Sequence, residues 1–151
     1  MQGVPWTGTR APIQPIGAMK REEPLSKILL VDDEDMTREM IRQALELRGY
    51  EVIEASNGEE ALRLNRSNPC PLVITDILMP DKEGLETIME LRREFPGSKI
   101  IAISGGGGVG RIDYLEAAQK FGAQATFQKP FELAKLFAAV ESLLQGEAAS
   151  G

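Results

Sequence analysis

The chain has 151 residues, of which 42% are hydrophobic and 26% charged, and this ordinary composition excludes disordered and collagen-like proteins. Its net charge of -6 argues against a nucleic-acid partner, because affinity for nucleic acid comes largely from basic side chains that neutralise phosphates. Since no apolar run is long enough to span a bilayer and no signal-peptide pattern opens the chain, we expect a cytoplasmic protein with no membrane partner.

The first residues differ in composition and hydrophobic pattern from the rest of the chain. Residues 1–25 hold four prolines and three glycines without an apolar period, and we interpret them, Trp6 included, as a flexible tail. Residues 26–145 alternate apolar runs with helical patterns and should form one folded domain. Residues 146–151 are expected to fray, and the length suggests no second domain.

Short apolar runs predict the strands, because strands buried on both faces of a parallel sheet read as continuous hydrophobic segments. Strong runs lie at 28–31, 72–74 and 100–103, and a weaker one lies at 125–127. Val52 and Ile53 form a shorter pair in a more polar setting, which is typical of an edge strand. The pattern therefore predicts five strands.

Helical periodicity fills the intervals between these runs. The predicted helices span about 35–48, 59–65, 84–95, 112–121 and 131–144. Gly49 and Gly122 stand where glycine often ends a helix. Five strands that alternate with five helices predict an α/β fold, in which helices cover both faces of a doubly wound, five-stranded parallel sheet.

Two residue types narrow the possible chemistry. With no histidine in the chain, Ser-His and Cys-His catalytic pairs and histidine metal sites are excluded, so any metal must have oxygen ligands. Cys70 is the only cysteine and cannot form an internal disulfide. We interpret it as a small buried hydrophobic residue.

Polar side chains follow four of the predicted strands, at the sheet edge where α/β proteins bind ligands. Carboxylates that meet at this edge repel one another unless a cation neutralises them, and Mg²⁺ accepts several carboxylates together with phosphate oxygens. A helix cap or a surface position would explain each residue singly, but their coincidence indicates a phosphoryl-transfer site. The residues are Asp32, Asp33, Asp76, Ser104 and Lys129.

The segments KILLVDDED, LVITDILMP, IIAIS and QKPF resemble, in order and spacing, the signature segments of response-regulator receiver domains of the CheY-like family. The resemblance runs from about residue 27 to residue 144. It implies a receiver of the single-domain type, with a flavodoxin-like (βα)₅ fold and strand order 2-1-3-4-5. It also implies a phosphoacceptor of a two-component phosphorelay, with slow autodephosphorylation, instead of an enzyme.

The resemblance also assigns roles to the clustered residues. It implies that Asp76 accepts the phosphoryl group, that Ser104 bonds a phosphate oxygen and that Lys129 pairs with the phosphoryl group. The peptide bond between Lys129 and Pro130 should be cis, as is common in the family. The ligands implied for Mg²⁺ are Asp32, Asp33, Asp76 and the backbone carbonyl of Leu78.

The partners implied are proteins. The phosphoryl donor in the family is a phosphohistidine on a sensor histidine kinase or a histidine phosphotransfer protein, and a chain without histidine can only receive. The signal would pass on by protein-protein contact with a target that the sequence does not identify.

Two features depart from the family pattern. Thr126 replaces the usual aromatic switch residue, and Phe127 should face the other side of the sheet because strand side chains alternate. A glycine-rich run occupies residues 105–110, directly after Ser104. We expect phosphorylation to order this loop and the start of the next helix, because glycine samples many backbone conformations.

Other functions fit the motifs less well. Gly105, Gly107 and Gly110 match the G-x-G-x-x-G pattern of dinucleotide sites, but the next strand does not end in the acidic residue that would bind ribose.

A Mg²⁺-dependent phosphatase is the stronger rival. Asp33, Asp35 and Thr37 form D-x-D-x-T, which resembles the nucleophile motif of haloacid-dehalogenase phosphatases, but neither a late acidic motif nor a cap domain follows. A pseudo-receiver that acts only as an interaction module is the third hypothesis, and the presence of all five site residues argues against it.

Overall fold

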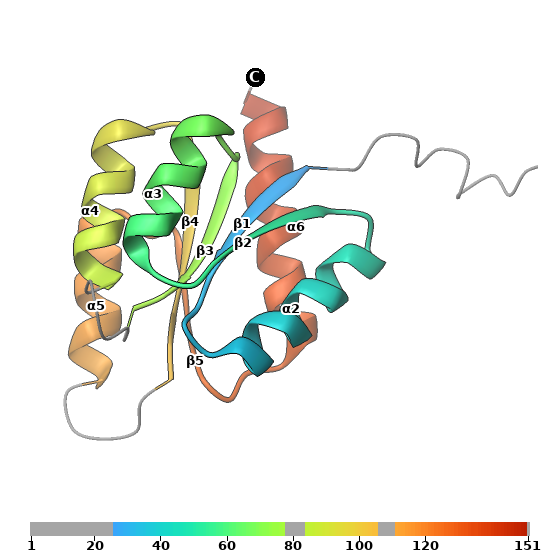
Figure 1. Ribbon diagram of the computed structural model, residues 1–151, viewed down its shortest axis with the longest axis horizontal. Helices are drawn as coiled ribbons and strands as arrows, with labels where there is room; N and C mark the ends of the chain where they lie inside the picture. Colours follow the sequence, from blue (N-terminus) through green and yellow to red (C-terminus); the bar gives the residue numbers. More distant parts are fainter. Residues whose placement is uncertain (1–25, 78–83, 106–110, 151) are drawn as a thin grey trace, which may run out of the picture.

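A five-stranded parallel sheet lies at the centre of the computed structural model, which describes residues 26–77, 84–105 and 111–150 (Figure 1). The order β2-β1-β3-β4-β5 places the more polar β2 at one edge, so the predicted topology and edge strand are confirmed. The strands are β1 (Lys27–Val31), β2 (Glu51–Ala55), β3 (Leu72–Asp76), β4 (Lys99–Ser104) and β5 (Ala125–Gln128).

Helices cover both faces of the sheet, with α2 and α6 on one face and α3, α4 and α5 on the other (Figure 1). Helix α6 continues beyond the predicted end at residue 144, through residues that were expected to fray. No helix in the described ranges is long and apolar enough to cross a membrane. The helices are α2 (Asp35–Leu47), α3 (Gly58–Ser67), α4 (Gly84–Glu94), α5 (Arg111–Phe121) and α6 (Leu133–Ser150).

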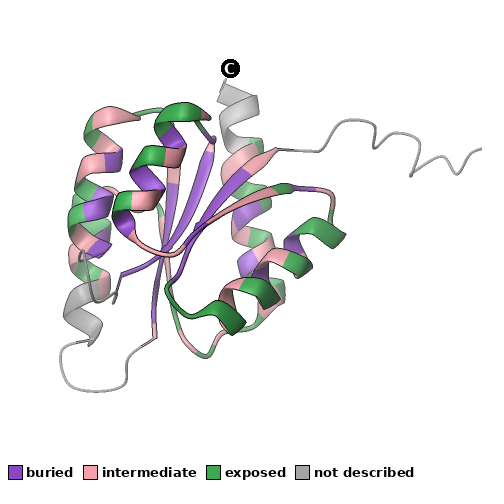
Figure 2. Ribbon diagram, in the orientation of Figure 1, coloured by how far each residue is buried: buried purple, intermediate pink, exposed green. Residues whose placement is uncertain are grey.

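Each face of the sheet has its own apolar cluster, because successive side chains of a strand point to opposite faces. Leu29 and Val73 pack toward α3, α4 and α5, whereas Ile28 and Ile74 pack toward α2 and α6. Figure 2 shows the central strands buried and the outer helix surfaces exposed. The continuous apolar runs of the sequence therefore reflect burial on both sides.

Helix ends follow the predicted glycine rule. Gly49 and Gly122 have φ angles of 101° and 125°, a region that side-chain-bearing residues rarely adopt. Helix α3 begins one residue before its predicted start, where the side chain of Asn57 accepts a hydrogen bond from the amide of Glu60 at 2.8 Å. This cap was not predicted.

Strand β5 carries the departure noted in the sequence. Thr126 pairs with Ala102, which belongs to the cluster under α3, α4 and α5, while Phe127 packs in the cluster under α2 and α6. The ring of Phe127 lies 5.6 Å from that of Phe131. The prediction that Phe127 faces away from the usual switch position is confirmed.

Cys70 lies in the segment that leads into β3 and is 2% exposed, as predicted for a small hydrophobic residue. Burial raises the pKa of its thiol to about 11, since a thiolate in an apolar setting loses its hydration. The unfolded chain would release this proton near pH 8.5. The native state should therefore lose stability as the pH rises from about 8.5 toward about 11.

We predict that Cys70→Ala is less stable than the native chain at pH 7, because it leaves a cavity. The difference in free energy of unfolding between the two proteins should become smaller by pH 10, because only the native chain loses stability as the thiol ionises. Urea unfolding of both proteins at the two pH values, with a reducing agent present, measures this difference. An equal difference at both pH values would contradict the prediction, because the thiol would then ionise alike in both states.

Candidate functional site

Hydrogen bonds that continue past the strand ends bring the candidate residues to one edge of the sheet. The Asp32 amide donates to the Ala55 carbonyl at 3.1 Å, which extends the pairing of β1 with β2. Toward the β5 end of the sheet, the Lys129 amide donates to the Ser104 carbonyl at 2.8 Å, which extends the pairing of β4 with β5. These backbone hydrogen bonds thus fix the positions of the Cα atoms from which the side chains of Asp32, Ser104 and Lys129 extend.

Three carboxylates meet at this edge. Asp32, Asp33 and Asp76 each offer an oxygen atom within 4.8 Å of the others, and no other such acidic, cysteine or histidine group exists among the described residues. Asp32 and Asp76 are 2% and 6% exposed, whereas Asp33 lies on the open rim. Oxygen ligands at this spacing suit a hard divalent cation.

Lys129 bridges the two buried carboxylates. Its Nζ atom lies 3.2 Å from Oδ2 of Asp32 and 3.4 Å from Oδ2 of Asp76, with Oε1 of Glu34 at 3.9 Å. Burial lowers the pKa of Lys129, but the carboxylates of Asp76 and Asp32 outweigh it and the pKa is raised overall. The ammonium is therefore charged at neutral pH and neutralises part of the acidic cluster.

Ser104 is the fifth member of the site. Its side chain is fully buried at the end of β4, and its hydroxyl has no hydrogen-bond partner among the described residues. A buried polar group without a partner costs about 1–3 kcal/mol, so such a hydroxyl is poised to bond an incoming ligand.

The peptide bond between Lys129 and Pro130, which follows β5, is cis as predicted.

The turn after β1 holds the Asp32 carboxylate in place. Oδ1 of Asp32 accepts a hydrogen bond from the Glu34 amide at 2.9 Å, and Oδ2 faces Lys129. Both carboxylate oxygens are therefore oriented by other groups.

Gly84, the first residue of α4, lies against the end of β3. Its amide donates to the Ile77 carbonyl at 3.2 Å. A Cβ atom at this position would lie 2.7 Å from the Asp76 carbonyl oxygen and would collide with the Cα atom of Ile77. Only glycine lets the helix approach the backbone of Asp76 this closely.

A cavity of about 500 Å³ opens beside Lys129, between the start of α2 and the loop that leads into α6. Met40 on α2 is half exposed, and Met36, one turn earlier, is 82% exposed. The cavity thus joins the charged site to an apolar surface. Its lining includes Thr37, Met40, Gly105, Pro130, Phe131 and Leu133.

Some predicted features lie outside the described residues. They include Leu78, the expected carbonyl ligand, and residues 106–110 of the glycine run with Gly107 and Gly110 of the dinucleotide pattern. All three residues of the phosphatase motif are described: Asp33 belongs to the acidic cluster, whereas Asp35 and Thr37 make other contacts. Asp35 is paired with Arg38 in the first turn of α2, and the Thr37 hydroxyl donates to Glu34 at 2.7 Å.

Two contacts of the site were missed by sequence reasoning. Gly84 was interpreted only as a helix start, although a glycine at the first helical position, where it gives no helical advantage, was a usable signal. Arg38 falls within the predicted helix at 35–48 and was assigned no role, yet its guanidinium donates to the Asp32 carbonyl at 2.6 Å. No sequence pattern distinguishes that contact from an ordinary surface charge.

The five-stranded fold, with an acidic cluster at the carboxyl edge of its sheet, is that of a receiver domain. The family model of the response regulator receiver domain matches residues 28–141, and the chain belongs to that family.

Curated relatives agree with this assignment. The probable transcriptional regulator ycf27 of Porphyra purpurea is 40% identical over 124 residues, which are 82% of this chain and 49% of that protein. A homolog of the transcriptional regulatory protein CpxR from Haemophilus influenzae is 36% identical over 125 residues, 82% of this chain and 52% of that protein. The chain therefore spans about half the length of these relatives.

Solved structures show the same fold over the whole of isolated receivers. A receiver domain from Clostridium thermocellum has a TM-score of 0.77 at 31% identity, covering 84% of this chain and all of that one. A CheY-like receiver protein from Methanospirillum hungatei also has a TM-score of 0.77, at 29% identity, covering 84% of this chain and 99% of that one.

We predict that Gly84→Ala destabilises the protein by about 1–3 kcal/mol, because overpacking at the end of β3 exceeds the gain of up to about 1 kcal/mol that alanine normally brings to a helix. Gly97→Ala is the matched control, since a Cβ atom there has no neighbour within 4 Å among the described atoms. It should change stability by less than about 0.5 kcal/mol. Urea unfolding gives both values, and equal effects would refute the close approach of Gly84.

Proposed function

We propose that this receiver accepts a phosphoryl group on Asp76, in a reaction that requires Mg²⁺, and then signals through contact with another protein. The observation that carries the proposal is the position of the buried Asp76 carboxylate, 3.4 Å from the Lys129 ammonium and grouped with Asp32 and Asp33. The hydroxyl of Ser104, buried without a partner among the described residues, supports it.

The chemistry follows from these positions. A carboxylate oxygen of Asp76 attacks the phosphorus atom of a phosphohistidine, the new P–O bond forms, and the P–N bond breaks with its electron pair passing to the imidazole. Lys129 pairs with an equatorial phosphoryl oxygen, and Ser104 donates a hydrogen bond to another. The protein mainly orients the nucleophile and neutralises charge.

The residues fit a magnesium ion. Three carboxylates carry about three negative charges and Lys129 one positive charge, which leaves an excess that a divalent cation would balance. Asp32, Asp33 and Asp76 would hold the ion, with the Leu78 carbonyl as the ligand expected from the family. Bound there, the ion would supply charge neutralisation for the phosphoryl oxygens.

The rival functions receive less support. The phosphatase hypothesis needs Asp35 near the nucleophile, but Asp35 is exposed and paired with Arg38. The pseudo-receiver hypothesis does not explain why two buried carboxylates, a lysine and a hydroxyl without a partner among the described residues should converge at one edge. Structural roles alone would favour fewer buried charges.

Our first prediction for this function concerns the acceptor. Acetyl phosphate with Mg²⁺ should add one acid-labile phosphoryl group to the native chain, and Asp76→Asn should abolish the label because an amide is a poor nucleophile. Chelation with EDTA should prevent labelling, and added Mg²⁺ should restore it. Intact-mass analysis measures the label.

The control is Glu59→Gln, which removes an exposed carboxylate of α3 outside the acidic cluster. It should label as the native chain does. A label that survives Asp76→Asn would place the acceptor elsewhere, and repeated turnover of a generic phosphate monoester would favour the phosphatase.

The donor protein is expected to dock beside the cavity. A phosphohistidine must bring its phosphorus atom to Asp76 near Lys129, and the apolar surface next to Lys129 includes Met40 and Phe131. Exposed methionines adapt their shape to a partner at little cost. We therefore assign this surface, formed by α2 and the loop before α6, to a sensor kinase or phosphotransfer protein.

We predict that Met40→Lys slows phosphotransfer from a histidine kinase roughly tenfold, because a charge replaces an apolar contact worth about 1–2 kcal/mol. Labelling by acetyl phosphate should not change. Met89→Lys on α4 is the control, because Met89 is 49% exposed against 50% for Met40 and lies on the other face of the sheet. The kinase used is one that phosphorylates the native chain, and equal slowing by both variants would count against the assigned surface.

A further inference from the structure

Arg38 connects the acidic site to the edge strand. Its Nη1 atom donates to the Asp32 carbonyl at 2.6 Å, its Nε atom to Oε1 of Glu54 on β2 at 2.9 Å, and its Nη2 atom to Oδ1 of Asp35 at 2.9 Å. The side chain is only 15% exposed. One planar guanidinium therefore contacts three groups that come from a strand end, a helix and a neighbouring strand.

The contact with Asp32 bears on the geometry of the site. The Asp32 carbonyl and the Asp33 amide share one rigid peptide plane, so a donor that fixes the carbonyl also fixes the direction in which Asp33 leaves the strand. The preceding peptide group is fixed as well, since the Asp32 amide donates to Ala55. Arg38 thus completes the restraint on the backbone between the two acidic residues.

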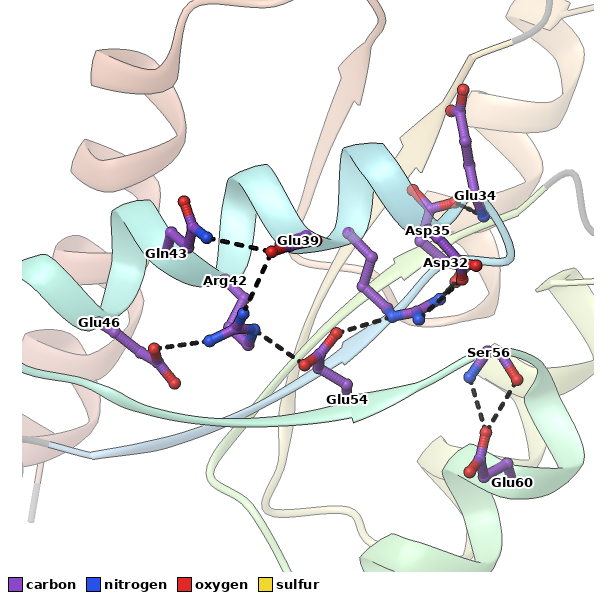
Figure 3. A network of polar contacts seen from close by, with 11 residues as sticks. Asp32, Glu34, Asp35, Glu39, Arg42, Gln43, Glu46, Glu54, Ser56 and Glu60 are labelled. Atoms are coloured by element: carbon purple, nitrogen blue, oxygen red, sulfur yellow. Dashed lines mark hydrogen bonds and ion pairs between the residues drawn. The ribbon is translucent and has the colours of Figure 1, made fainter.

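Glu54 holds Arg38 in this position and also binds Arg42, one turn further along α2. Its Oε1 atom pairs with Arg38. Its Oε2 atom lies 2.8 Å from Nε of Arg42, and Figure 3 draws this contact between the two labelled residues. The other ion-pair partners of Arg42 are Glu39 and Glu46, on the helix surface. Arg42 therefore shares the anchor of Arg38 without sharing its contact with the site.

The charge of Arg38 is balanced locally. Burial lowers the pKa of the guanidinium, but hydrogen bonds to Glu54 and Asp35 outweigh this and the pKa is raised overall. Two carboxylates therefore compensate a fully charged donor. Arg38 can orient the Asp32 carbonyl without adding a net positive charge close to a cation site.

We infer that Arg38 is a positioning residue for the cation site, which fixes the peptide plane between Asp32 and Asp33 so that both carboxylates face Asp76. The inference rests on the proposed magnesium function. A positioning role and a simple charge effect predict opposite results, because removing a positive charge near a cation site would tighten cation binding, whereas losing the backbone restraint would weaken it.

Two variants of Arg38 separate these effects. Arg38→Gln removes both the charge and the three-way contact, and Arg38→Lys keeps the charge but lacks the planar fork that reaches three partners. If Arg38 positions the site, both variants should weaken Mg²⁺ binding roughly tenfold in calorimetric titration. If its charge alone matters, Arg38→Lys should bind as the native chain does and Arg38→Gln should bind more tightly, and either result would overturn the inference.

Arg42→Gln is the matched control, because it removes an ion pair to the same Glu54 from the same helix. It should leave Mg²⁺ affinity within about twofold of the native value, since Arg42 has no described contact with the acidic cluster. Equal weakening by Arg42→Gln and Arg38→Gln would assign the effect to the stability of the ion-pair network and would overturn the inference. Thermal unfolding of each variant measures that stability separately.

A readout without metal keeps the inference distinct from the proposed function. The ¹⁵N resonance of the Asp33 amide responds to hydrogen bonding at the Asp32 carbonyl, so it should shift in metal-free Arg38→Lys and stay in place in Arg42→Gln. A native chain that binds no Mg²⁺ but shows this pattern would refute the magnesium function and retain the backbone restraint. An unchanged Asp33 resonance in Arg38→Lys would refute the positioning role itself.

Discussion

The site depends on one ammonium group that two buried carboxylates share. Asp32 and Asp76 come from neighbouring parallel strands, and burying two like charges at one edge costs several kcal/mol unless an opposite charge lies between them. Lys129 supplies that charge from the far edge of the sheet, at 3.2 and 3.4 Å. Parallel strands make this possible, because their carboxyl ends all open on the same edge.

Lys129 neutralises only part of the negative charge of the acidic cluster. One ammonium contacts two of the three clustered carboxylates, and the Ser104 hydroxyl is buried without a partner in the described part of the chain. The net negative charge of the cluster and the buried Ser104 hydroxyl match the divalent cation and the phosphoryl oxygen of the proposed function.

The strands and the main site residues were predictable because burial on both faces leaves a continuous apolar signature, and the residue that follows each strand must reach the ligand edge. The apolar runs that end at Val31 and Ile74 lie so close to Asp32 and Asp76 that they predict where both aspartates stand along their strands. The contacts of Arg38 and Gly84 were not predictable in the same way. They depend on how a helix is oriented against a strand, and an amphipathic pattern gives the buried face of a helix without its exact rotation or distance.

Helix ends show the same limit. The caps at Gly49 and Gly122 were predictable because a positive φ angle selects glycine directly. The end of α6 was not, since Leu144 closes the apolar pattern while the backbone continues as helix to Ser150. Local helix propensity also decides where a helix ends, and the hydrophobic period does not record it.

The division of the core into two clusters has a consequence for how such a chain can diverge. The sheet backbone separates the cluster under α2 and α6 from the cluster under α3, α4 and α5, so side chains of one cluster do not share partners with those of the other. Substitutions on opposite faces should then combine additively. The surface assigned to the donor lies on the first face, and Thr126, at the position of the usual switch, belongs to the second. Natural selection can therefore change the packing around Thr126 with little effect on the surface assigned to the donor.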